Sequence, residues 1–534
     1  MTRTRPALPL ALAATLGLAL LPAISPALAA TTAAAPSDFD GDGRADLAIG
    51  APGENLGSTA NAGMINVLYG DSSGLTAAGD QAWSQPSSGI KGTPASGDGF
   101  GGALASADFD RDGRADLAIG VPLDAGGGVA KAGAVNVLYG SASGLVAAGD
   151  QLFDQATLPD APEPGDGFGQ ALAAGDFDGD GYGDLAIGAP GEQLGAGQAP
   201  GLVIVAYGGP AGLSTTDATT LTRASTGAPY LSDETPHGFG YALAAGDLDG
   251  DSDADLAVGS PASGSSGDDP LRPLVDGEVS VFYGGSTGLV GAGSQVWTED
   301  STGIPGEGEG GDWFGVSVAI GDFDGDGPAD LAVGARYDRV GGLIAGAATV
   351  IYGTPTGLAA DGAQLWHQDV AGVPGGAESG DTFGAAVAAG DLDGDGREDL
   401  AIGAPGEAIG SGEPGAGIVN VLYGTSSGLS ATGAQTWSQD SAGVPGGAEA
   451  TEFAWDAFGS DLAIANFGRS SRADLAVGVH LEAIGSRREA GMVNVIYGTA
   501  SGLSSTGAQG WSQDSSGVKD TAETRDYLGT SLSQ

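Results

Sequence analysis

The chain has 534 residues, including 101 Gly and no Cys, and its 68 acidic and 18 basic residues give a formal net charge of −50 at pH 7. This acidic excess excludes nucleic acid as a partner, since phosphate binding depends on clustered Lys and Arg, and the lack of Cys excludes disulfides, thiol catalysis and cysteine zinc sites. With 41% hydrophobic residues and its acids grouped in repeated segments, the composition favours a folded, loop-rich β protein over a disordered polyanion.

The first element in chain order is a secretory signal peptide over residues 1–30. Arg3 and Arg5 give it a positive start, Ala7–Leu21 form its apolar run, and a small-residue cleavage site follows. Residues 31–37 form a short linker. No later apolar stretch approaches the roughly 18–20 residues that a membrane helix requires. We therefore expect a secreted protein that is extracellular or associated with the cell envelope.

Residues 38–534 consist of seven copies of one segment, spaced about 70 residues apart. Six copies contain an aspartate-rich loop of the form D-x-D-x-D-x-x-x-D, and a decayed seventh copy begins at Asn466. The six intact loops begin at Asp38, Asp108, Asp176, Asp247, Asp322 and Asp391. A fixed period of this kind indicates one structural unit repeated in tandem.

Each copy contains the same four apolar runs in the same order. In the third copy these runs are Phe168–Ala174, Asp184–Gly188, Leu202–Tyr207 and a weaker run near Leu221. Their short length and their flanking Gly, Pro, Asp and Ser residues predict strands rather than helices. Four strands in each of seven units predict an all-β, seven-bladed β-propeller.

The two ends of the repeat region are complementary. Six copies have a Phe-Gly strand directly upstream of the loop, but the first copy has none. Tyr527–Leu532 has the spacing of such a strand and is followed by no loop. We therefore expect the N-terminal and C-terminal segments to pair and close the ring.

The loops are predicted calcium sites. In the first copy, carboxylates occupy positions 1, 3, 5 and 9 of the loop, and position 7 offers a backbone carbonyl. Four carboxylates at this spacing repel one another unless a cation lies among them, and a cage of oxygen ligands suits Ca²⁺. An acidic surface turn would explain one such loop but not six. The helix–loop–helix calcium hand needs twelve loop positions between two helices, whereas strands are expected here.

We predict about six Ca²⁺ ions, one for each intact loop, and none in the seventh copy, where Asp474 is the one carboxylate at the four ligand positions. The predicted ligand residues are Asp38, Asp40, Asp42, Arg44, Asp46, Asp108, Asp110, Asp112, Arg114, Asp116, Asp176, Asp178, Asp180, Tyr182, Asp184, Asp247, Asp249, Asp251, Asp253, Asp255, Asp322, Asp324, Asp326, Pro328, Asp330, Asp391, Asp393, Asp395, Arg397 and Asp399.

The Phe-Gly strand, the aspartate loop and the Gly-Ala-Pro that follows it form a specific combination. Gly-Ala-Pro occurs at Gly50–Pro52, Gly188–Pro190 and Gly403–Pro405. The combined motif, from about Asp38 to Leu532, resembles the FG-GAP repeat of the integrin alpha-chain N-terminal propeller. This resemblance implies structural calcium and a role in adhesion or ligand recognition. Loops fill more blades here than in integrin alpha chains, and nothing resembling the leg domains or membrane anchor follows, so integrin-style signalling is not implied.

We expect no catalytic activity. The histidines His237, His367 and His480 do not share a repeat position. Gly70–Gly74 matches the G-x-S-x-G elbow of serine hydrolases, but it lies in a Tyr-Gly-x-x-x-Gly-Leu turn that recurs in all seven copies, several of them with Ala or Pro at the nucleophile position. No helix is expected after this turn.

Large aromatic residues recur at fixed places in the copies. They could stack on sugars or fill the space between blades, and we favour packing. One series is Trp83, Phe153, Trp297, Trp366, Trp437 and Trp511, and the other is Tyr69, Tyr139, Tyr207, Tyr283, Tyr352, Tyr423 and Tyr497.

The sequence therefore predicts a monomeric binding or adhesion module for an extracellular protein or glycan. A secreted hydrolase of unassigned type and a structural component of the cell envelope stay open as alternatives. The copies differ most in the segments between their second and third strands, such as Gly53–Gly63, Gly191–Pro200 and Ser260–Asp276. Variable loops on a repeated scaffold are candidates for the partner site.

Overall fold

The computed structural model describes residues 37–158, 161–193, 200–227, 238–261, 277–410, 415–448 and 455–533. The described residues belong to one compact unit, Ala33–Gln534. The predicted signal peptide, residues 31–36 of the linker and His237 lie outside them. Within the described part of the chain, no helix has the length and hydropathy needed to cross a membrane.

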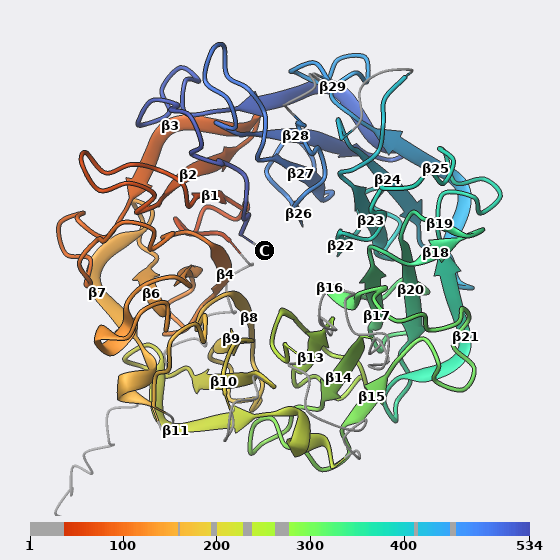
Figure 1. Ribbon diagram of the computed structural model, residues 1–534, viewed down its shortest axis with the longest axis horizontal. Helices are drawn as coiled ribbons and strands as arrows, with labels where there is room; N and C mark the ends of the chain where they lie inside the picture. Colours follow the sequence, from red (N-terminus) through yellow and green to blue (C-terminus); the bar gives the residue numbers. More distant parts are fainter. Residues whose placement is uncertain are drawn as a thin grey trace, which may run out of the picture. The chain divides into compact units, whose positions relative to one another are not determined.

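The fold is an all-β propeller of seven blades (Figure 1), as predicted. Every strand pair is antiparallel, and in each blade the strands are neighbours in chain order, apart from a small hairpin inserted in the fifth blade. The first strand of a four-stranded blade lies at the ring centre and the fourth lies at its outer edge (Figure 1).

The strand bounds are, blade by blade, β1 Leu47–Ala51, β2 Met64–Asp71 and β3 Gly74–Trp83; β4 Ala103–Ala107, β5 Asp116–Val121, β6 Ala134–Tyr139 and β7 Val146–Phe153; β8 Ala171–Gly175, β9 Asp184–Ala189, β10 Leu202–Tyr207 and β11 Ser214–Leu221; β12 Ala242–Gly246, β13 Asp255–Ser260, β14 Glu278–Phe282 and β15 Gln295–Trp297; β16 Phe314–Gly321, β17 Asp330–Ala335, β20 Ala347–Tyr352 and β21 Ala359–Trp366, with the hairpin β18 Arg339–Val340 and β19 Leu343–Ile344; β22 Ala386–Gly390, β23 Asp399–Ala404, β24 Ile418–Tyr423 and β25 Ser430–Trp437; and β26 Leu462–Ala465, β27 Asp474–Val479, β28 Met492–Thr499 and β29 Gly502–Trp511. The described residues also contain three short 3₁₀ helices, η1 Gly126–Gly128, η2 Gln155–Thr157 and η3 Arg223–Thr226.

The second strand of each blade is a continuous apolar run because neighbouring blades cover both of its faces. In β5, β9 and β23, for example, every residue is buried. The hydrophobic core is correspondingly divided among the blade interfaces: one cluster combines Ile65 and Val67 of β2 with Leu117 and Ile119 of β5. A strand buried on both sides cannot show polar–apolar alternation, which is why these segments read as short unbroken apolar runs.

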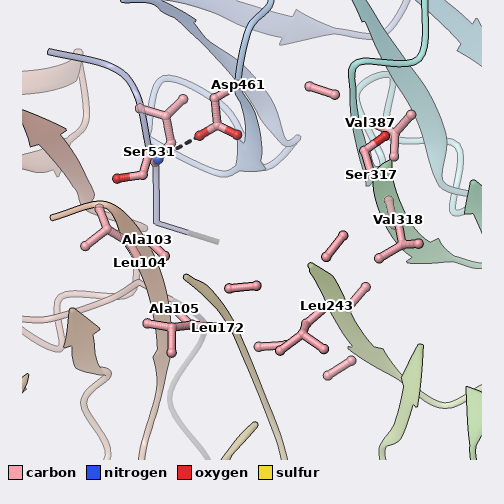
Figure 2. A pocket seen from close by; sticks show the side chains of 18 of the residues that line it. Ala103, Leu104, Ala105, Leu172, Leu243, Ser317, Val318, Val387, Asp461 and Ser531 are labelled. Carbon is pink, nitrogen blue, oxygen red and sulfur yellow. Dashed lines mark hydrogen bonds between the residues drawn. The ribbon is translucent and has the colours of Figure 1, made fainter. Parts of the chain in front are cut away.

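The inner strands are rich in Ala because strands from all the blades converge at the axis. They surround a central cavity of about 430 Å³, to which the C-terminal segment contributes Ser531 and Leu532. Figure 2 shows Ala103, Leu172 and Leu243 lining this cavity from three blades. Asp461 also lines it, and its carboxylate accepts a hydrogen bond from the Leu532 backbone N–H at 2.8 Å.

The first blade has only three strands of its own, and the C-terminal segment lies along the free edge of β1. The Gly50 N–H donates to the Ser531 carbonyl at 2.8 Å, and the Ser533 N–H donates to the Ala48 carbonyl at 3.0 Å. Ile49 and Leu532 form an antiparallel bridge. The C-terminal residues thus stand where the other blades have their inner strand.

The recurring aromatic residues pack between blades, as predicted. Phe153 and Trp366 are buried members of hydrophobic clusters, and the tryptophans at positions 83, 297, 437 and 511 are partly buried against such clusters. The tyrosines also link blades by hydrogen bonds. Tyr352 donates its hydroxyl to Gln364 of its own blade at 2.7 Å and accepts the Leu429 N–H of the next blade at 3.0 Å.

The tyrosine link can be tested with Tyr352→Phe. This change leaves the buried Leu429 N–H without its acceptor, so the free energy of unfolding should fall by about 1–3 kcal/mol. Denaturant-induced unfolding measures the change. Tyr337→Phe, in which the ring lies beside Trp313 and Arg336, is the matched control and should stay within about 0.5 kcal/mol of the parent protein.

Candidate metal centres

The aspartate loops connect the first and second strands of the four-stranded blades, and the loop at Asp38 leads into β1. Asp108–Asp116, for example, runs from the end of β4 to the beginning of β5. Because successive antiparallel turns alternate between the two ends of a blade, all six loops lie on one face of the ring, which we call the loop face. The turns between third and fourth strands lie on this same face.

The aspartate at position 1 organises each loop through backbone hydrogen bonds. In the first loop, Oδ1 of Asp38 accepts the N–H groups of Gly41 and Asp42 at 2.9 and 3.0 Å, and Oδ2 accepts the N–H of Gly43 at 2.9 Å. The other five intact loops repeat the bonds to the fifth and sixth positions. The loop is therefore curled around its first carboxylate.

Glycine is required where this curl needs a positive φ. Gly41 and Gly43 have φ angles of 75° and 90°. The fourth loop has Ser252 at the place of Gly43 and keeps the same backbone conformation, with φ at 82°. An L-residue is strained in this region, so this loop adopts the common shape at a local cost.

The aspartate at position 9 ties the loop to the rest of the blade. The two carboxylate oxygens of Asp46 accept the Phe39 N–H of the loop and the Gly70 N–H at the end of the third strand, both at 2.9 Å. All six intact copies make this pair of bonds, and Asp474 of the decayed seventh copy makes it too. Position 9 is thus a structural link in every blade, a role that the sequence pattern alone does not reveal.

Burial disfavours the charged form of the position 9 carboxylates when no cation is nearby. Desolvation, with added repulsion from Asp40, raises the pKa of Asp46 to about 8, and the same main cause raises the pKa of Asp116 to about 8. The pKa values of Asp184, Asp255, Asp330 and Asp399 rise to about 7 for the same reason. Near neutral pH, these buried groups are stable either as protonated carboxyls or as carboxylates with a positive charge nearby.

The spacing of the carboxylate oxygens fits a calcium ion. One oxygen from each of Asp38, Asp40 and Asp42 can be chosen so that all lie within 4.8 Å of one another. Ca²⁺ takes oxygen ligands at about 2.3–2.6 Å, so ligands on opposite sides of one ion lie about 5 Å apart. The set Asp176, Asp178 and Asp180 of the third loop meets the same condition, as does the set Asp108, Asp110 and Asp116 of the second loop.

The residues at position 7 contribute differently from the aspartates. The Arg44 guanidinium forms an exposed ion pair with Asp42 at 2.9 Å, so its side chain lies beside a predicted ligand. Arg114 and Arg397 make the equivalent pairs with Asp112 and Asp395. Their backbone carbonyls, and those of Tyr182, Asp253 and Pro328, are the oxygens that could contribute to a cage.

The seventh loop carries arginines near its single carboxylate. The Arg469 guanidinium lies 4.2 Å from the ring centroid of Tyr497. Burial raises the pKa of Asp474 to about 7, and the positive charge of Arg469 opposes this rise. Arg472 donates to the Asp393 carbonyl of the neighbouring loop at 2.7 Å. At the carboxylate positions 1, 3 and 5 this loop has Asn466, Gly468 and Ser470, and the absence of an ion from it stays a prediction.

The structure also bears on the supposed serine elbow. Gly74 begins β3 directly after the turn, and the Asp71 carboxylate accepts the N–H and hydroxyl of Ser73. The match at Gly70–Gly74 is therefore a β-hairpin turn without the helix that a nucleophile elbow requires.

Comparison with known proteins identifies the repeat. A model of the FG-GAP repeat matches residues 30–68, 100–138, 168–205, 239–282, 314–351 and 383–422. Phosphatidylinositol-glycan-specific phospholipase D of Rattus norvegicus is 34% identical over 176 residues, which are 33% of this chain and 20% of that protein. Integrin alpha-PS2 of Drosophila melanogaster is 33% identical over 236 residues, which are 42% of this chain and 15% of that protein. The chain thus spans a fifth or less of these curated relatives.

Among solved structures, a Bacillus licheniformis rhamnogalacturonan lyase, PL11, aligns with 93% of this chain and 76% of its own at 12% identity and a TM-score of 0.34. At this level the likeness carries no functional argument.

The number of Ca²⁺ ions bound per chain tests each loop separately. Asp178→Ala removes a predicted ligand of the third loop without touching the link made by Asp184, so one Ca²⁺ equivalent should be lost while the other loops keep theirs. Equilibrium dialysis with radioactive Ca²⁺ measures the count. An unchanged count would contradict binding at this loop.

The pH dependence of stability tests the position 9 carboxylates. Their pKa values are raised on folding from 3.8 to about 7–8, so the calcium-free protein should be most stable at low pH and should lose stability as pH rises from about 4 through 8. Calorimetry with chelator should therefore give a higher Tm at pH 5.5 than at pH 8. Saturating Ca²⁺ should raise the Tm most at pH 8, because each occupied site adds about 2.7 kcal/mol to the free energy of unfolding at one hundred times Kd. Equal Tm values with and without chelator at pH 8 would argue against structural calcium.

Proposed function

Because the chain is an FG-GAP repeat protein related to integrin alpha chains, we propose that it is a secreted, calcium-stabilised propeller that binds an extracellular protein or glycan through the face opposite its aspartate loops. The connections between second and third strands, and those leading to the next blade, lie on this opposite face, which we call the variable face. Two of the three variable segments named from the sequence lie partly or almost wholly outside the described residues.

The distribution of exposed hydrophobic side chains carries this proposal. Among the described residues, the exposed large hydrophobic side chains are Leu123, Val290, Leu343, Ile344 and Trp455. All except Val290 belong to connections on the variable face, and Trp455 is 55% exposed. These side chains come from three separate connections, so a partner lying across the variable face would contact several of them at once.

An aromatic group on the same face supports this choice. The Arg336 guanidinium lies 4.3 Å from the ring centroid of Trp313 and 4.7 Å from that of Tyr337. Tyr241 packs against the edge of Trp313, with 6.3 Å between ring centroids. Arg, Trp and Tyr are the residue types that most often dominate binding energy at interfaces, and such rings also stack on sugars.

A hydrolase is the second candidate, because a relative of part of this chain is a phospholipase D. The structure offers one pair worth testing: Nδ1 of His480 lies 2.7 Å from Oγ of Ser460. Burial lowers the pKa of His480 to about 4, which makes it a weak general base at neutral pH. We therefore favour a binding module without chemistry of its own over an enzyme. A structural role in the cell envelope would make an envelope polymer the bound partner.

The test uses labelled protein on intact cells of the producing organism and on panels of extracellular proteins and glycans, in the presence of Ca²⁺. Trp455→Ser and the double change Leu343→Ser with Ile344→Ser should each weaken binding by about tenfold or more, since an interface anchor contributes at least about 1.4 kcal/mol. Val290→Ser, the matched control, removes an exposed apolar side chain from the other face and should leave binding unchanged.

Equal losses for Val290→Ser and Trp455→Ser would contradict the assignment of the binding face. Turnover of ester, phosphodiester or glycan substrates that disappears in Ser460→Ala would contradict the binding-only function and favour the hydrolase.

A further inference from the structure

A second set of polar side chains repeats around the ring, on the variable face and between adjacent blades. Each set, which we call an interblade cluster, combines a Gln two residues after the outer aromatic position, an Asp just before the next Phe-Gly strand and an acid from the following connection between second and third strands. The clusters in the described residues are Gln513, Asp526 and Glu54; Gln85, Asp98 and Asp124; Gln155, Asp166 and Glu192; Glu299, Asp312 and Asp338; Gln368, Asp381 and Glu407; and Gln439, Asp456 and Glu482.

The members of the clusters are buried, apart from the half-buried Asp124. In the cluster that joins the last blade to the first, Gln513 and Glu54 are each 2% exposed and Asp526 is fully buried. Nε2 of Gln513 donates to the Glu54 carboxylate at 2.9 Å. The same amide-to-carboxylate bond occurs in the other four clusters that contain Gln, at distances of 2.5–3.0 Å.

Some buried acceptor oxygens of the clusters have no donor. Oε1 of Gln513 and Oδ1 of Asp526 have no hydrogen-bond partner in the structure. The Oε1 atoms of Gln85, Gln155, Gln368 and Gln439 are also without a partner. Because a half-turn of the amide exchanges Oε1 and Nε2, each Gln can present Oε1 at the place where Nε2 now contacts the cluster carboxylate. Buried oxygens of this kind are normally satisfied by a donor or a cation.

One blade interface departs from this pattern in an informative way. Between the third and fourth blades, Arg223 stands at the Gln position, and the sequence has His237 and Ser263 at the two acid positions, both outside the described residues. The Arg223 guanidinium donates to the Glu278 carboxylate at 2.7 and 2.9 Å, and both side chains are buried.

Glu278 is the first residue of the third strand of its blade, and Met64 is the equivalent residue of the first blade. In the first blade, the Sδ atom of Met64 lies 3.5 Å from Nε2 of Gln513. The ion pair therefore lies at the place that a Gln occupies elsewhere. Where the sequence lacks both acids of the cluster, it supplies a positive side chain instead.

We propose that the interblade clusters bind Ca²⁺, with the Gln amide oxygen and the carboxylates of the two acids as ligands. Oxygens of Glu54, Glu523 and Asp526 lie within 4.8 Å of one another, and so do oxygens of Glu163, Asp166 and Glu192. An all-oxygen set with two or three carboxylates suits a hard divalent cation. An ion here fastens one blade to the next, whereas an ion in an aspartate loop lies within a single blade.

A proton is the competing occupant. Burial, and next the repulsion from Asp526, raises the pKa of Glu54 to about 8, so a carboxyl–carboxylate pair could also hold one proton near neutral pH. The experiment must therefore separate bound metal from bound proton.

The test compares the full chain with the double variant Glu54→Gln with Asp526→Asn, which preserves side-chain shape and removes both charges. Equilibrium dialysis with radioactive Ca²⁺ at pH 7.5 should show one equivalent fewer than in the parent protein, and the Tm in saturating Ca²⁺ should fall. Asp361→Asn, the matched control, neutralises an exposed acid of β21 and should change neither value. The loop variant Asp178→Ala loses its equivalent independently, so failure at the loops and failure at the clusters are distinguishable.

An unchanged Ca²⁺ count with an unchanged or higher Tm in the double variant would overturn the proposal, because neutral amides then simply relieve repulsion between buried acids. Loss of a bound proton without loss of calcium would overturn it as well. If the double variant does not fold, Gln513→Met removes the amide oxygen at similar volume and should weaken one Ca²⁺ site by about tenfold or more. An unaltered calcium titration of Gln513→Met would overturn the proposal.

Discussion

Each blade depends on one buried aspartate that accepts backbone N–H groups from two separate segments. Asp46 holds the loop at Phe39 and the end of the third strand at Gly70, and Asp474 makes the same two bonds in a copy that has lost its other acids. A carboxylate can do this because its two oxygens accept several donors at once, and bonds to a charged group are stronger than neutral ones. The loop is thereby fixed to the sheet without an ion. The remaining aspartates lie on a loop whose position these two bonds already set.

Burial of the carboxylate that makes these bonds has an electrostatic cost. A carboxylate in a desolvated position strongly favours a nearby positive charge or a proton. The chain has four aspartates at the same spacing in six loops, whereas the seventh keeps only Asp474 of the four. The buried Arg223 and Glu278 repeat this exchange at a blade interface that lacks the usual acids. The proposed divalent cations and the observed Arg223 would answer the same need for positive charge beside buried carboxylates.

Much of the architecture could be predicted from the sequence because it is carried by local patterns. The four runs of the third copy correspond to β8–β11, since a strand covered on both sides by neighbouring blades leaves a short unbroken apolar run. The loop positions were equally readable, because their spacing alone sets which oxygens can approach one another. The relation of Gln513 to Glu54 could not be read in this way. These residues are 459 positions apart, and only the arrangement of the blades brings them together. The recurring Asp before each Phe-Gly strand was visible in the sequence, but a buried role could not be separated from that of an ordinary turn residue.

The C-terminal strand-like segment has a consequence for biosynthesis. Ala48 and Ser533, which meet at the edge of the first sheet, are separated by 485 residues. At a translation rate of about 5–20 residues per second, the first sheet would wait about 25–100 s for its innermost partner. During that interval β1 presents an unpaired edge, so nascent chains of this protein need to be kept apart until the last residues emerge.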